Sequence, residues 1–500
     1  MKVFIFYIGT PTPIFETELE LIRKHEKSGD TVRVLQCAGN LANCHWNKQH
    51  MNGCCARCRS KFKNGWDVLN SCKKVELKQF PPNKLMPSDL PFIFNSVDDL
   101  KRYRYDNENI GLGIAASLIT IFRDHRFDTH KYHNEVIREL STAVQVYETL
   151  KREFEEFKPD RVYIFNGRIT THLPAILLCK RMEMEYFTYE VAGTPNRYLL
   201  RKNSTPHSRR AMCEEIDILW SAGGAEREKT ARLFFEQKRA RVEREKMISF
   251  IKYQVKNLLP KGFDKDKKNI AIFNSTIDEY AAMEGWENTL YMPDETAGIR
   301  RILETFESDD RYMFYLRIHP HMKEILSTVS QLRDIRELSS RFGNLCVIWP
   351  AEFVDSYALM DACEKIITFG STMGIEAAYW GKPSILAGHA LYEHLDCIYV
   401  PKTHEELVKL LEEDLIPLPA DSALKYGFRD VSHGIPFEYF KETGFKDGLA
   451  TGTFDGVEIK PDALPALWYK IQFFLWRIKR VFMNPSLIVR KLEKYAKTIH

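Results

Sequence analysis

The sequence predicts an α/β protein with two Rossmann-like, doubly wound domains that face a central cleft, and three observations carry this prediction. In both halves of the chain, short apolar runs alternate with segments of helical periodicity, the pattern of parallel sheets with crossover helices. The 500 residues exceed what a single hydrophobic core usually holds. Between the halves, residues 258–268 (LLPKGFDKDKK) combine proline, glycine and charge, as a domain linker does.

The first domain is expected at residues 1–257. It opens with a strand at 2–7, a helix at 15–27 and a strand at 31–35, which is the start of a Rossmann-like unit. The remaining elements expected in it are a buried helix at 110–122, helices at 132–156, 172–181 and 225–257, and strands at 161–165, 186–189 and 216–220.

The second domain is expected at residues 269–460, where the alternation of strands and helices restarts. Five such alternations indicate a doubly wound parallel sheet. The expected strands are 270–273, 312–318, 345–349, 366–369 and 384–387, and the expected helices are 296–306, 356–362, 372–379 and 405–412.

The composition and the known sequence motifs exclude several classes of protein. With 72 basic and 68 acidic residues, the net charge of +4 is too balanced to indicate nucleic-acid binding. No apolar run reaches the roughly 18 residues of a membrane span, and the first residues suggest a buried strand rather than a signal peptide. We therefore expect a cytoplasmic protein whose eleven cysteines are reduced. Neither a P-loop nor a Rossmann G-x-G-x-x-G after the first strand occurs, which disfavours NTPases and dehydrogenases.

An insertion at about residues 37–72 holds six of the eleven cysteines. The spacing C-x6-C-x9-C-C-x2-C offers four soft ligands on short loops, as a structural zinc ion or an iron–sulfur cluster requires. A set of free thiols in a surface loop is the alternative. The predicted metal ligands are Cys37, Cys44, Cys55 and Cys58.

Residues 461–500 are expected to form a C-terminal amphipathic basic helix. In WYKIQFFLWRIKRVF, aromatic and aliphatic side chains stand beside lysine and arginine, a combination that suits an anionic membrane surface. The alternative is a helix that docks back on the first domain, and both can hold on different faces. Membrane contact would make the protein peripheral at the inner face of the cytoplasmic membrane.

A phosphate site is predicted where two strands of the second domain end. The strand at 366–369 runs into Gly370, Ser371 and Thr372 and then into a helix, which offers backbone N–H groups and two hydroxyls. Arg317 and His319, at the end of the strand at 312–318, can add charge or hydrogen bonds.

Further candidates follow other strands or open the next helix. Glu376, one helical turn past Thr372, either accepts sugar hydroxyls or offsets the helix dipole. In the first domain, Asn166 and Arg168 follow the strand at 161–165, and Glu190 ends the strand at 186–189. A loop ion pair and a solvated loop carboxylate are the alternatives for these three residues.

Two stretches, RIHPH and FGSTMGIEAAYWGKPSI, resemble the C-terminal half of bacterial capsule and surface-polysaccharide glycosyltransferases of GT-B architecture. They are similar to the HP and SS motifs of sialyl-, polysialyl- and Kdo-transferases, which hold the nucleotide and phosphate of a CMP-activated sugar. The resemblance implies that His319 and Pro320 contact the nucleotide and that Ser371 and Thr372 hold the phosphate.

The stretch FNSTIDEY, which contains Ser275, falls where those families place another loop of the cleft. The acidic-acidic-Gly motif of the families is not intact here, because Asp278 and Glu279 are followed by Tyr280. The resemblance covers residues 270–411 well. The first domain shares with these families only the alternation of strands and helices.

These features predict an inverting GT-B glycosyltransferase that needs no catalytic metal. It would move a sugar from a nucleotide-sugar donor onto a glycan or lipid-linked acceptor of a surface polysaccharide, lipopolysaccharide or capsule. Inversion requires a base on the acceptor hydroxyl and stabilisation of the leaving phosphate. Glu190 is the first candidate base, Asp278 and Glu279 follow, and His319 acts at the phosphate. The alternatives are a nucleotide-sugar epimerase or hydrolase of the same fold, or a non-catalytic assembly protein of a polysaccharide synthesis complex.

Overall fold

A computed structural model describes residues 1–69, 74–85, 89–242, 251–286, 290–324, 329–446 and 449–483. The chain divides into two compact units. Unit 1 consists of Met1–Met86, Val144–Tyr163 and Phe437–His500, and unit 2 consists of Pro87–Ala143 and Ile164–Pro436. The linker predicted at residues 258–268 lies inside unit 2, and the domain end predicted at residue 460 lies inside unit 1.

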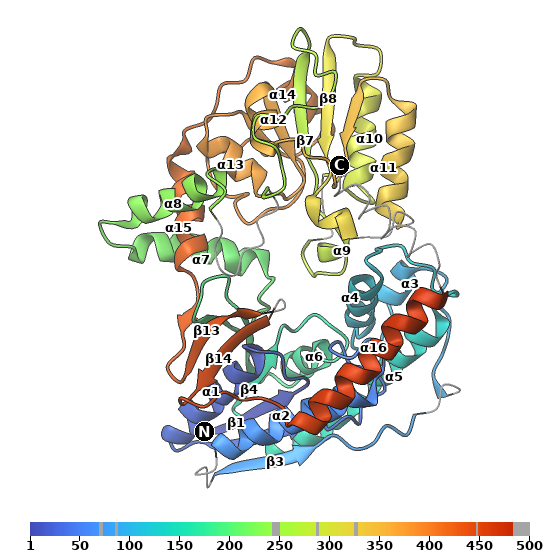
Figure 1. Cartoon of the computed structure of the whole chain (residues 1–500), viewed down its shortest axis with the longest axis vertical. Helices are drawn as coiled ribbons and strands as arrows, with labels where there is room; N and C mark the ends of the chain where they lie inside the picture. Colours follow the sequence, from blue (N-terminus) through green and yellow to red (C-terminus); the bar gives the residue numbers. More distant parts are fainter. Residues whose placement is uncertain are drawn as a thin grey trace. The chain divides into compact units, whose positions relative to one another are not determined.

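A parallel sheet forms the centre of unit 1 (Figure 1). β1 (Lys2–Tyr7) pairs with β2 (Thr31–Gln36) and with the start of β4 (Arg161–Phe165), and β2 pairs with β3 (Val75–Gln79). Every residue of β1 after the first is buried, as expected for a strand covered on both faces. The β-α-β opening is confirmed, because α1 (Ile14–Lys27) joins β1 to β2. The other helices with residues in this unit are α2 (Asn52–Val68), α5 (His133–Phe157) and α16 (Ala463–Met483).

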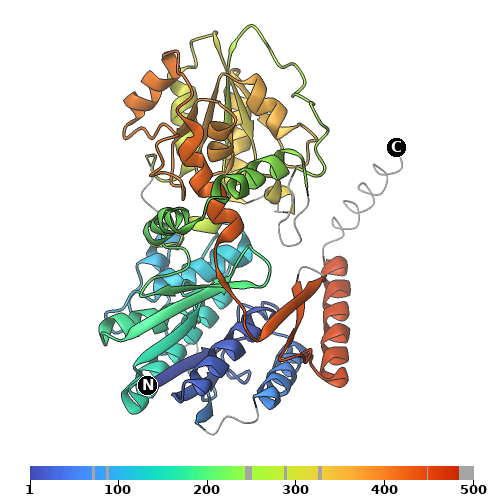
Figure 2. The ribbon, with the colours of Figure 1, turned by 90° about the vertical axis from the view of Figure 1, so that its left-hand side faces the viewer.

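The C-terminal segment of unit 1 adds a hairpin that the sequence did not reveal. β13 (Phe440–Lys446) and β14 (Leu449–Phe454) pair antiparallel, and Figure 2 shows them in orange-red beside the blue N-terminal helices. The fully buried carboxylate of Glu20 on α1 accepts the backbone N–H groups of Glu438 and Tyr439, each at 2.8 Å, and of Phe440 at 3.3 Å. A single side chain of α1 therefore anchors the start of the hairpin.

The five-stranded sheet of unit 2 is entirely parallel, with the order β11-β10-β7-β8-β9. Its first strand in the chain, β7, lies in the middle, and the chain reverses its direction of winding between β7 and β10. Ligands of doubly wound sheets bind at the carboxyl ends of the strands at such a switch point. The strands are β7 (Lys268–Phe273), β8 (Tyr312–Arg317), β9 (Leu345–Ile348), β10 (Lys365–Thr368) and β11 (Ser384–Leu386).

Helices pack on both faces of this sheet, and two apolar clusters fill the space beneath them. On one side Ile299, Ile302 and Leu303 of α10 meet β7 and β8, and on the other Leu359 and Met360 of α12 meet β7. The helices of this part are α9 (Ile277–Tyr280), α10 (Glu295–Thr305), η2 (Pro320–Glu324), α11 (Ser330–Arg341), α12 (Ser356–Ala362), α13 (Met373–Tyr379), α14 (His404–Glu412), η3 (Ala420–Ser422) and α15 (Ala423–Ser432).

The rest of unit 2 continues from the end of β4. In the strand order β4 is followed by β5 (Glu185–Val191), β6 (Arg197–Lys202) and β12 (Ile435–Pro436), and β6 pairs antiparallel with both of its neighbours. The seven-stranded and five-stranded sheets are thus dominated by parallel strands and are Rossmann-like, which confirms the predicted α/β fold. The remaining helices are α3 (Val97–Lys101), α4 (Gly111–Phe122), α6 (Leu173–Arg181), α7 (Arg209–Ala222) and α8 (Arg227–Arg239). No helix of the described ranges is long and apolar enough to cross a membrane.

Two predicted elements are wrong. The strand expected at 216–220 lies within α7, where Ile216 is buried and Ile218 is exposed, because a short apolar run fits a helix as well as a strand. Within the single helix expected at 225–257, the described residues form α8, which ends at Arg239, and residues 243–250 lie outside the described ranges. Arg241, shortly beyond α8, has a left-handed backbone (φ +60°) that a continuing α-helix does not allow.

Replacing Glu20 by alanine should destabilise the protein strongly. The change leaves three buried or half-buried backbone N–H groups without their acceptor, and each such group costs about 1–3 kcal/mol. We expect the free energy of unfolding in urea to fall by at least about 2 kcal/mol. Glu155→Ala, at an exposed position of α5, is the control. Equal stabilities of the two variants would show that the hairpin does not depend on Glu20.

Candidate functional site

The strand ends at the switch point of the five-stranded sheet approach each other closely. β10 ends at Thr368 and is followed by Gly370, whose φ of +127° favours glycine. A Cβ atom at this position would lie 2.8 Å from the carbonyl oxygen of His389 and 3.1 Å from Oγ of Ser275. The loops that follow β7, β10 and β11 therefore meet at Gly370, and only a residue without a side chain fits between them.

A cavity of about 270 Å³ opens beside this meeting point. Four predicted site residues line it: Ser275, Glu279, Gly370 and Thr372. The remainder of its wall is rich in aromatic and imidazole side chains, which suit a flat ring and hydrogen-bonding groups. They are His207, Tyr280, Trp286, Phe369, His389, Tyr392 and Tyr426.

Thr372 is held in place by an ion pair behind it. Its hydroxyl donates to Oε1 of Glu376 at 2.8 Å and accepts from Nζ of Lys238 at 3.1 Å, and Lys238 and Glu376 lie 2.8 Å apart. Tyr357 donates to the other oxygen of Glu376, so both carboxylate oxygens of this buried residue have protein partners. Ser371 stands at the same turn, where its hydroxyl accepts the N–H of Met373 at 3.3 Å.

The end of β8 carries the predicted residues Arg317, His319 and Pro320. Arg317 is buried and donates to the carbonyl oxygens of Trp349 at 3.0 Å and Glu352 at 3.4 Å, and burial lowers its pKa to about 10. The backbone N–H of His319 donates to Oδ1 of Asn274 at 2.9 Å, and Nδ1 accepts the N–H of His321 at 3.2 Å. Burial lowers the pKa of His319 to about 4, so its imidazole is neutral and Nε2 carries the proton.

Asn166 joins two ionisable groups on the β4 and β5 side of unit 2. Its Nδ2 donates to Oε2 of Glu190 at 2.8 Å and lies 2.9 Å from Nε2 of His207. Burial raises the pKa of Glu190 and lowers the pKa of His207 to about 3. Glu190, Asn166 and His207 thus form a row of side chains in contact, and His207 at its end lines the cavity.

Arg168 lies between this row and the loop after β7. Its Nη1 donates to the carbonyl oxygen of Glu279 at 3.0 Å, and its buried Nε has no hydrogen-bond partner among the described residues. Burial lowers the pKa of Arg168, and the charges of Glu190, Glu279 and Asp278 oppose that effect.

The two acidic residues of the IDEY stretch differ in environment. Asp278 is buried and forms an ion pair with Nε of Arg123 at 3.0 Å, and burial raises its pKa. Glu279 is exposed to solvent and lines the cavity. Of the three predicted base candidates, Glu190, Asp278 and Glu279, the cavity wall therefore includes only Glu279.

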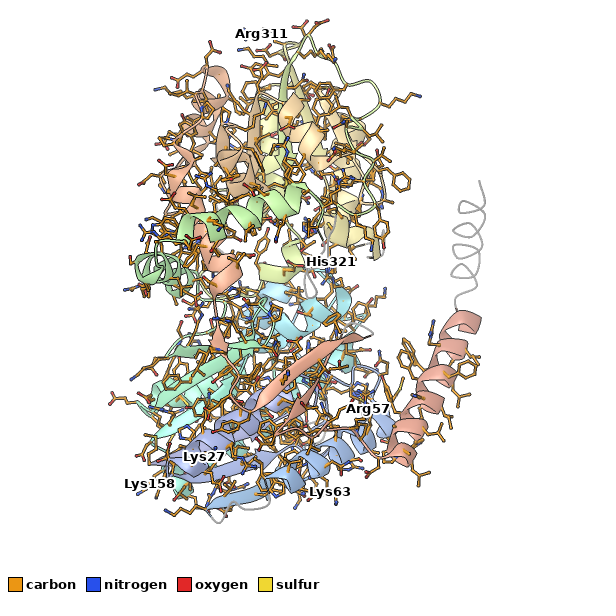
Figure 3. All side chains as sticks on the ribbon, turned by 60° about the vertical axis from the view of Figure 1, so that its left-hand side comes forward. Lys27, Arg57, Lys63, Lys158, Arg311 and His321 are labelled. Carbon is orange, nitrogen blue, oxygen red and sulfur yellow. The ribbon has the colours of Figure 1, made fainter. Side chains whose placement is uncertain are left out.

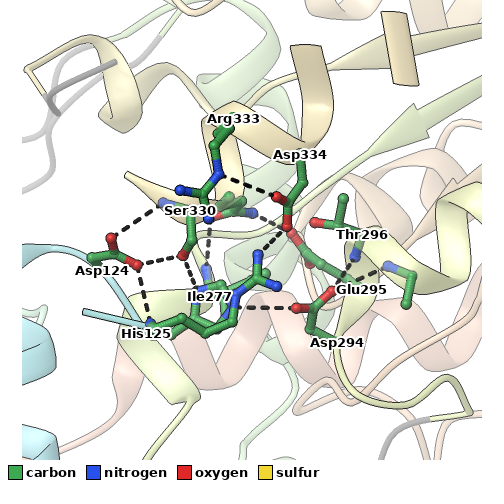
Figure 4. A network of polar contacts seen from close by, with 12 residues as sticks. Asp124, His125, Ile277, Asp294, Glu295, Thr296, Ser330, Arg333 and Asp334 are labelled. Atoms are coloured by element: carbon green, nitrogen blue, oxygen red, sulfur yellow. Dashed lines mark hydrogen bonds and ion pairs between the residues drawn. The ribbon is translucent and has the colours of Figure 1, made fainter. Parts of the chain in front are cut away.

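A polar network ties the loop after α4 to the helices beside the five-stranded sheet (Figure 4). Asp124 accepts from the backbone N–H of Ser330 at 3.2 Å and from its hydroxyl. His125 lies 3.3 Å from Oγ of Ser330 through Nδ1 and 3.2 Å from Asp294 through Nε2. Asp294 also caps α10 by accepting the N–H groups of Thr296 and Ala297, so the loop is fixed to the starts of α10 and α11.

The neighbouring Glu295 is a buried carboxyl group with four donors around it. Nε2 of Gln331 and Nδ2 of Asn274 approach Oε1 at 2.7 and 3.3 Å, while the Ser275 N–H and the Tyr280 hydroxyl each approach Oε2 at 3.2 Å. Burial raises its pKa to about 8. Two of the donors, Ser275 and Tyr280, line the cavity.

The predicted metal ligands do not form a metal site. Cys37, Cys44, Cys55 and Cys58 border one pocket of unit 1, yet no group of three or more His, Cys, Asp or Glu among the described residues is placed to hold a metal ion. The sulfurs have separate partners: Asn47 approaches Cys55 at 3.4 Å and Tyr7 approaches Cys58 at 3.7 Å. Burial raises the pKa of Cys37 to about 11 and also raises the pKa of Cys44, which favours neutral thiols.

Sequence reasoning missed His207, Trp286, His389 and Lys238. His389 had a usable signal, because it follows the correctly predicted strand at 384–387 by two residues. His207 stands in a loop before α7, where a strand was predicted instead of a helix, and Lys238 reaches Glu376 from 138 residues away. A contact between residues so far apart in the sequence cannot be predicted from a local sequence pattern.

Comparison with known proteins gives distant similarities to proteins of the GT-B fold. No family model matches the chain, and no curated protein matches it. Among solved structures, the chain is similar to the β-Kdo 2,4-transferase of Thermosulfurimonas dismutans KpsC, with a TM-score of 0.36 and 14% identity over 54% of this chain and 79% of that one. It is also similar to the UDP-GlcNAc 2-epimerase of Neisseria meningitidis, with a TM-score of 0.28 and 12% identity over 86% and 98% of the two chains. The β-Kdo 2,7-transferase of the same KpsC has a TM-score of 0.33 and 13% identity over 61% and 86%.

The buried Glu295 should make stability depend on pH. Its pKa of about 8 lies above the value of about 4.3 in an unfolded chain, so the folded state binds more protons between these values. Stability therefore falls as the pH rises through this window. We expect the urea midpoint of the wild type to drop relative to that of Glu295→Gln between pH 5 and pH 9. The exposed Glu307→Gln serves as the control, and parallel pH profiles for Glu295→Gln and the wild type would contradict the prediction.

Proposed function

We propose that the protein is a glycosyltransferase of the GT-B type that binds a nucleotide-sugar donor in the cavity at the switch point. One observation carries the proposal: the loops after β7, β10 and β11 meet around Gly370 beside a cavity walled by aromatic rings and hydroxyls. Open α/β sheets bind nucleotides at this position. The resemblance of the RIHPH and GST stretches to the motifs of sialyl- and Kdo-transferases adds support and favours a CMP-activated sugar.

In this proposal the phosphates lie against Ser275, Gly370 and Thr372, with Ser371 at the same turn. Backbone N–H groups and the Ser371 hydroxyl supply the hydrogen bonds, and Lys238 holds Thr372 in place through its contact with the Thr372 hydroxyl. The rings of Trp286 and Tyr280 offer faces for a nucleobase. Glu376 is then a positioning residue, because its two oxygens already hold Lys238, Thr372 and Tyr357.

We further propose Glu279 as the general base, in preference to Glu190. An acceptor hydroxyl must come within hydrogen-bond reach of the base, and Glu279 is exposed at the cavity wall. Glu190 stands behind Asn166 and His207, where its raised pKa suits an indirect role. Arg168 donates to the carbonyl oxygen of Glu279 and so helps to hold the loop that carries this base. The acceptor belongs, in this proposal, to a surface polysaccharide, lipopolysaccharide or capsule.

A nucleotide should bind in the cavity and depend on Gly370. We expect one member of a panel of CMP, CDP, UDP, GDP and ADP to raise the melting temperature, because a ligand that binds only the native state stabilises it. Gly370→Ala should abolish the shift, since the new Cβ would clash with His389 and Ser275. Gly381→Ala is a matched control with positive φ and open space around it. Ser371→Ala/Thr372→Ala should weaken binding as well. If no nucleotide stabilises the wild type, the donor site is refuted and the assembly protein is favoured.

The two candidate bases make opposite kinetic predictions. Glu279→Gln should lower kcat by about 10²–10⁴-fold, the usual contribution of a general base, while the Kd for the nucleotide stays unchanged. Glu190→Gln should have a smaller effect and shift the pH profile. A large kcat loss in Glu190→Gln alone would reverse the assignment. Rapid release of free sugar or of an epimer from the donor without acceptor would instead indicate a hydrolase or an epimerase.

A further inference from the structure

The helix α16 uses one face to dock within unit 1. Cζ of Arg57 on α2 lies 4.7 Å from the centroid of the Tyr469 ring, and Gly53 of α2 donates its N–H to Oε1 of Gln472 at 2.7 Å. A Cβ at Gly53 would lie 2.9 Å from Cα of Tyr469, so the two helices are in close contact. Figure 3 labels Arg57 beside this helix. The docking predicted as the alternative for the C-terminal helix is therefore present.

The opposite face of α16 is apolar and exposed. Leu464 is 80% exposed and Phe474 is 63% exposed, and the apolar residues of this face recur every three or four positions. Single exposed apolar residues are ordinary, but a continuous stripe on one helix marks an interaction surface. The stripe spans residues 464–478 of the helix, so it runs along roughly 21 Å. The members of this apolar stripe are Leu464, Leu467, Trp468, Ile471, Phe474, Leu475 and Ile478.

The charge of α16 is of a single sign. Residues 463–483 contain no aspartate or glutamate, and they contain four cations, Lys470, Arg477, Lys479 and Arg480. The first three are exposed beside the apolar stripe. An amphipathic helix with cations beside its apolar face lies in the plane of an anionic lipid surface, where the cations meet the head groups.

We propose that the apolar stripe of α16 inserts into the interface of an anionic phospholipid membrane. The apolar side chains enter the boundary of the acyl chains, and Lys470, Arg477 and Lys479 bind anionic head groups. The face that carries Tyr469 and Gln472 stays on α2, so the membrane contact needs no rearrangement of unit 1. The charge favours lipid over a second copy of the chain, because two helices with four cations each would repel one another.

The test is flotation of the full chain with vesicles of phosphatidylcholine, with and without phosphatidylglycerol. We expect binding to the anionic vesicles that weakens as salt is added. Leu467→Gln/Phe474→Gln should reduce the affinity about tenfold or more, because it removes apolar burial. Lys470→Gln/Lys479→Gln should reduce it more than about tenfold, since each cation near an anionic surface contributes about fivefold.

Ile218→Gln is the matched control, because Ile218 is an exposed apolar residue of a helix in unit 2. It should bind vesicles like the wild type, and circular dichroism should show that all variants are folded. Absence of vesicle binding, or equal binding to neutral vesicles, overturns the proposal. So does a dimer in light scattering that Leu467→Gln/Phe474→Gln converts to a monomer, since the stripe would then cover a second copy. The melting-temperature shifts with the nucleotide panel are measured on the same variants. Unchanged shifts in variants that have lost vesicle binding separate this inference from the proposed function.

Discussion

The buried carboxyl group of Glu295 fixes the loop after β7, which forms part of the cavity wall. It receives the side-chain amides of Asn274 and Gln331 and the backbone N–H of Ser275. Asn274 in turn accepts the N–H of His319, so a group at the start of α10 fixes the loops after both β7 and β8. A carboxyl group offers an oxygen to the donors on each side, whereas the amide of a glutamine would turn its NH₂ group toward two of them.

The position of Ser275 then sets the space around Gly370. Glu295 and Gln331 hold the backbone of Ser275, and the Ser275 hydroxyl donates to the carbonyl oxygen of Phe369, just after β10, at 3.4 Å. Gly370 fits against it only without a Cβ, and the cavity lies directly beside this contact. The site thus depends on a loop after β7 that a buried acid holds, and on the close approach of the loops after β10 and β11 to it.

Sequence reasoning found the strand ends and missed what their side chains contact. Short apolar runs in the sequence predict buried parallel strands. The residues after β7, β8 and β10 were therefore correctly placed at one edge of the sheet. The direction of Arg317 toward the carbonyl of Trp349 depends on the loop after β9, and the pairing of Glu376 depends on Lys238 from α8. The cysteine spacing suggested a metal, but α2 directs the sulfurs of Cys55 and Cys58 to Asn47 and Tyr7 instead. A local sequence pattern predicts the type of secondary structure, but it does not predict which distant residue a side chain contacts.

The cations Lys238 and Arg317 already have partners within the protein, and this pairing affects how the proposed sugar transfer is accelerated. The charge of Lys238 is balanced by Glu376, and Arg317 donates to carbonyl groups away from the cavity wall. His207 and His319, with pKa values of about 3 and 4, are neutral near pH 7. In the proposed function, a phosphate beside a neutral imidazole raises the pKa of that imidazole, and does so most when the leaving group gains negative charge. Stabilisation that grows as charge develops favours the transition state over the bound donor, which is what catalysis requires.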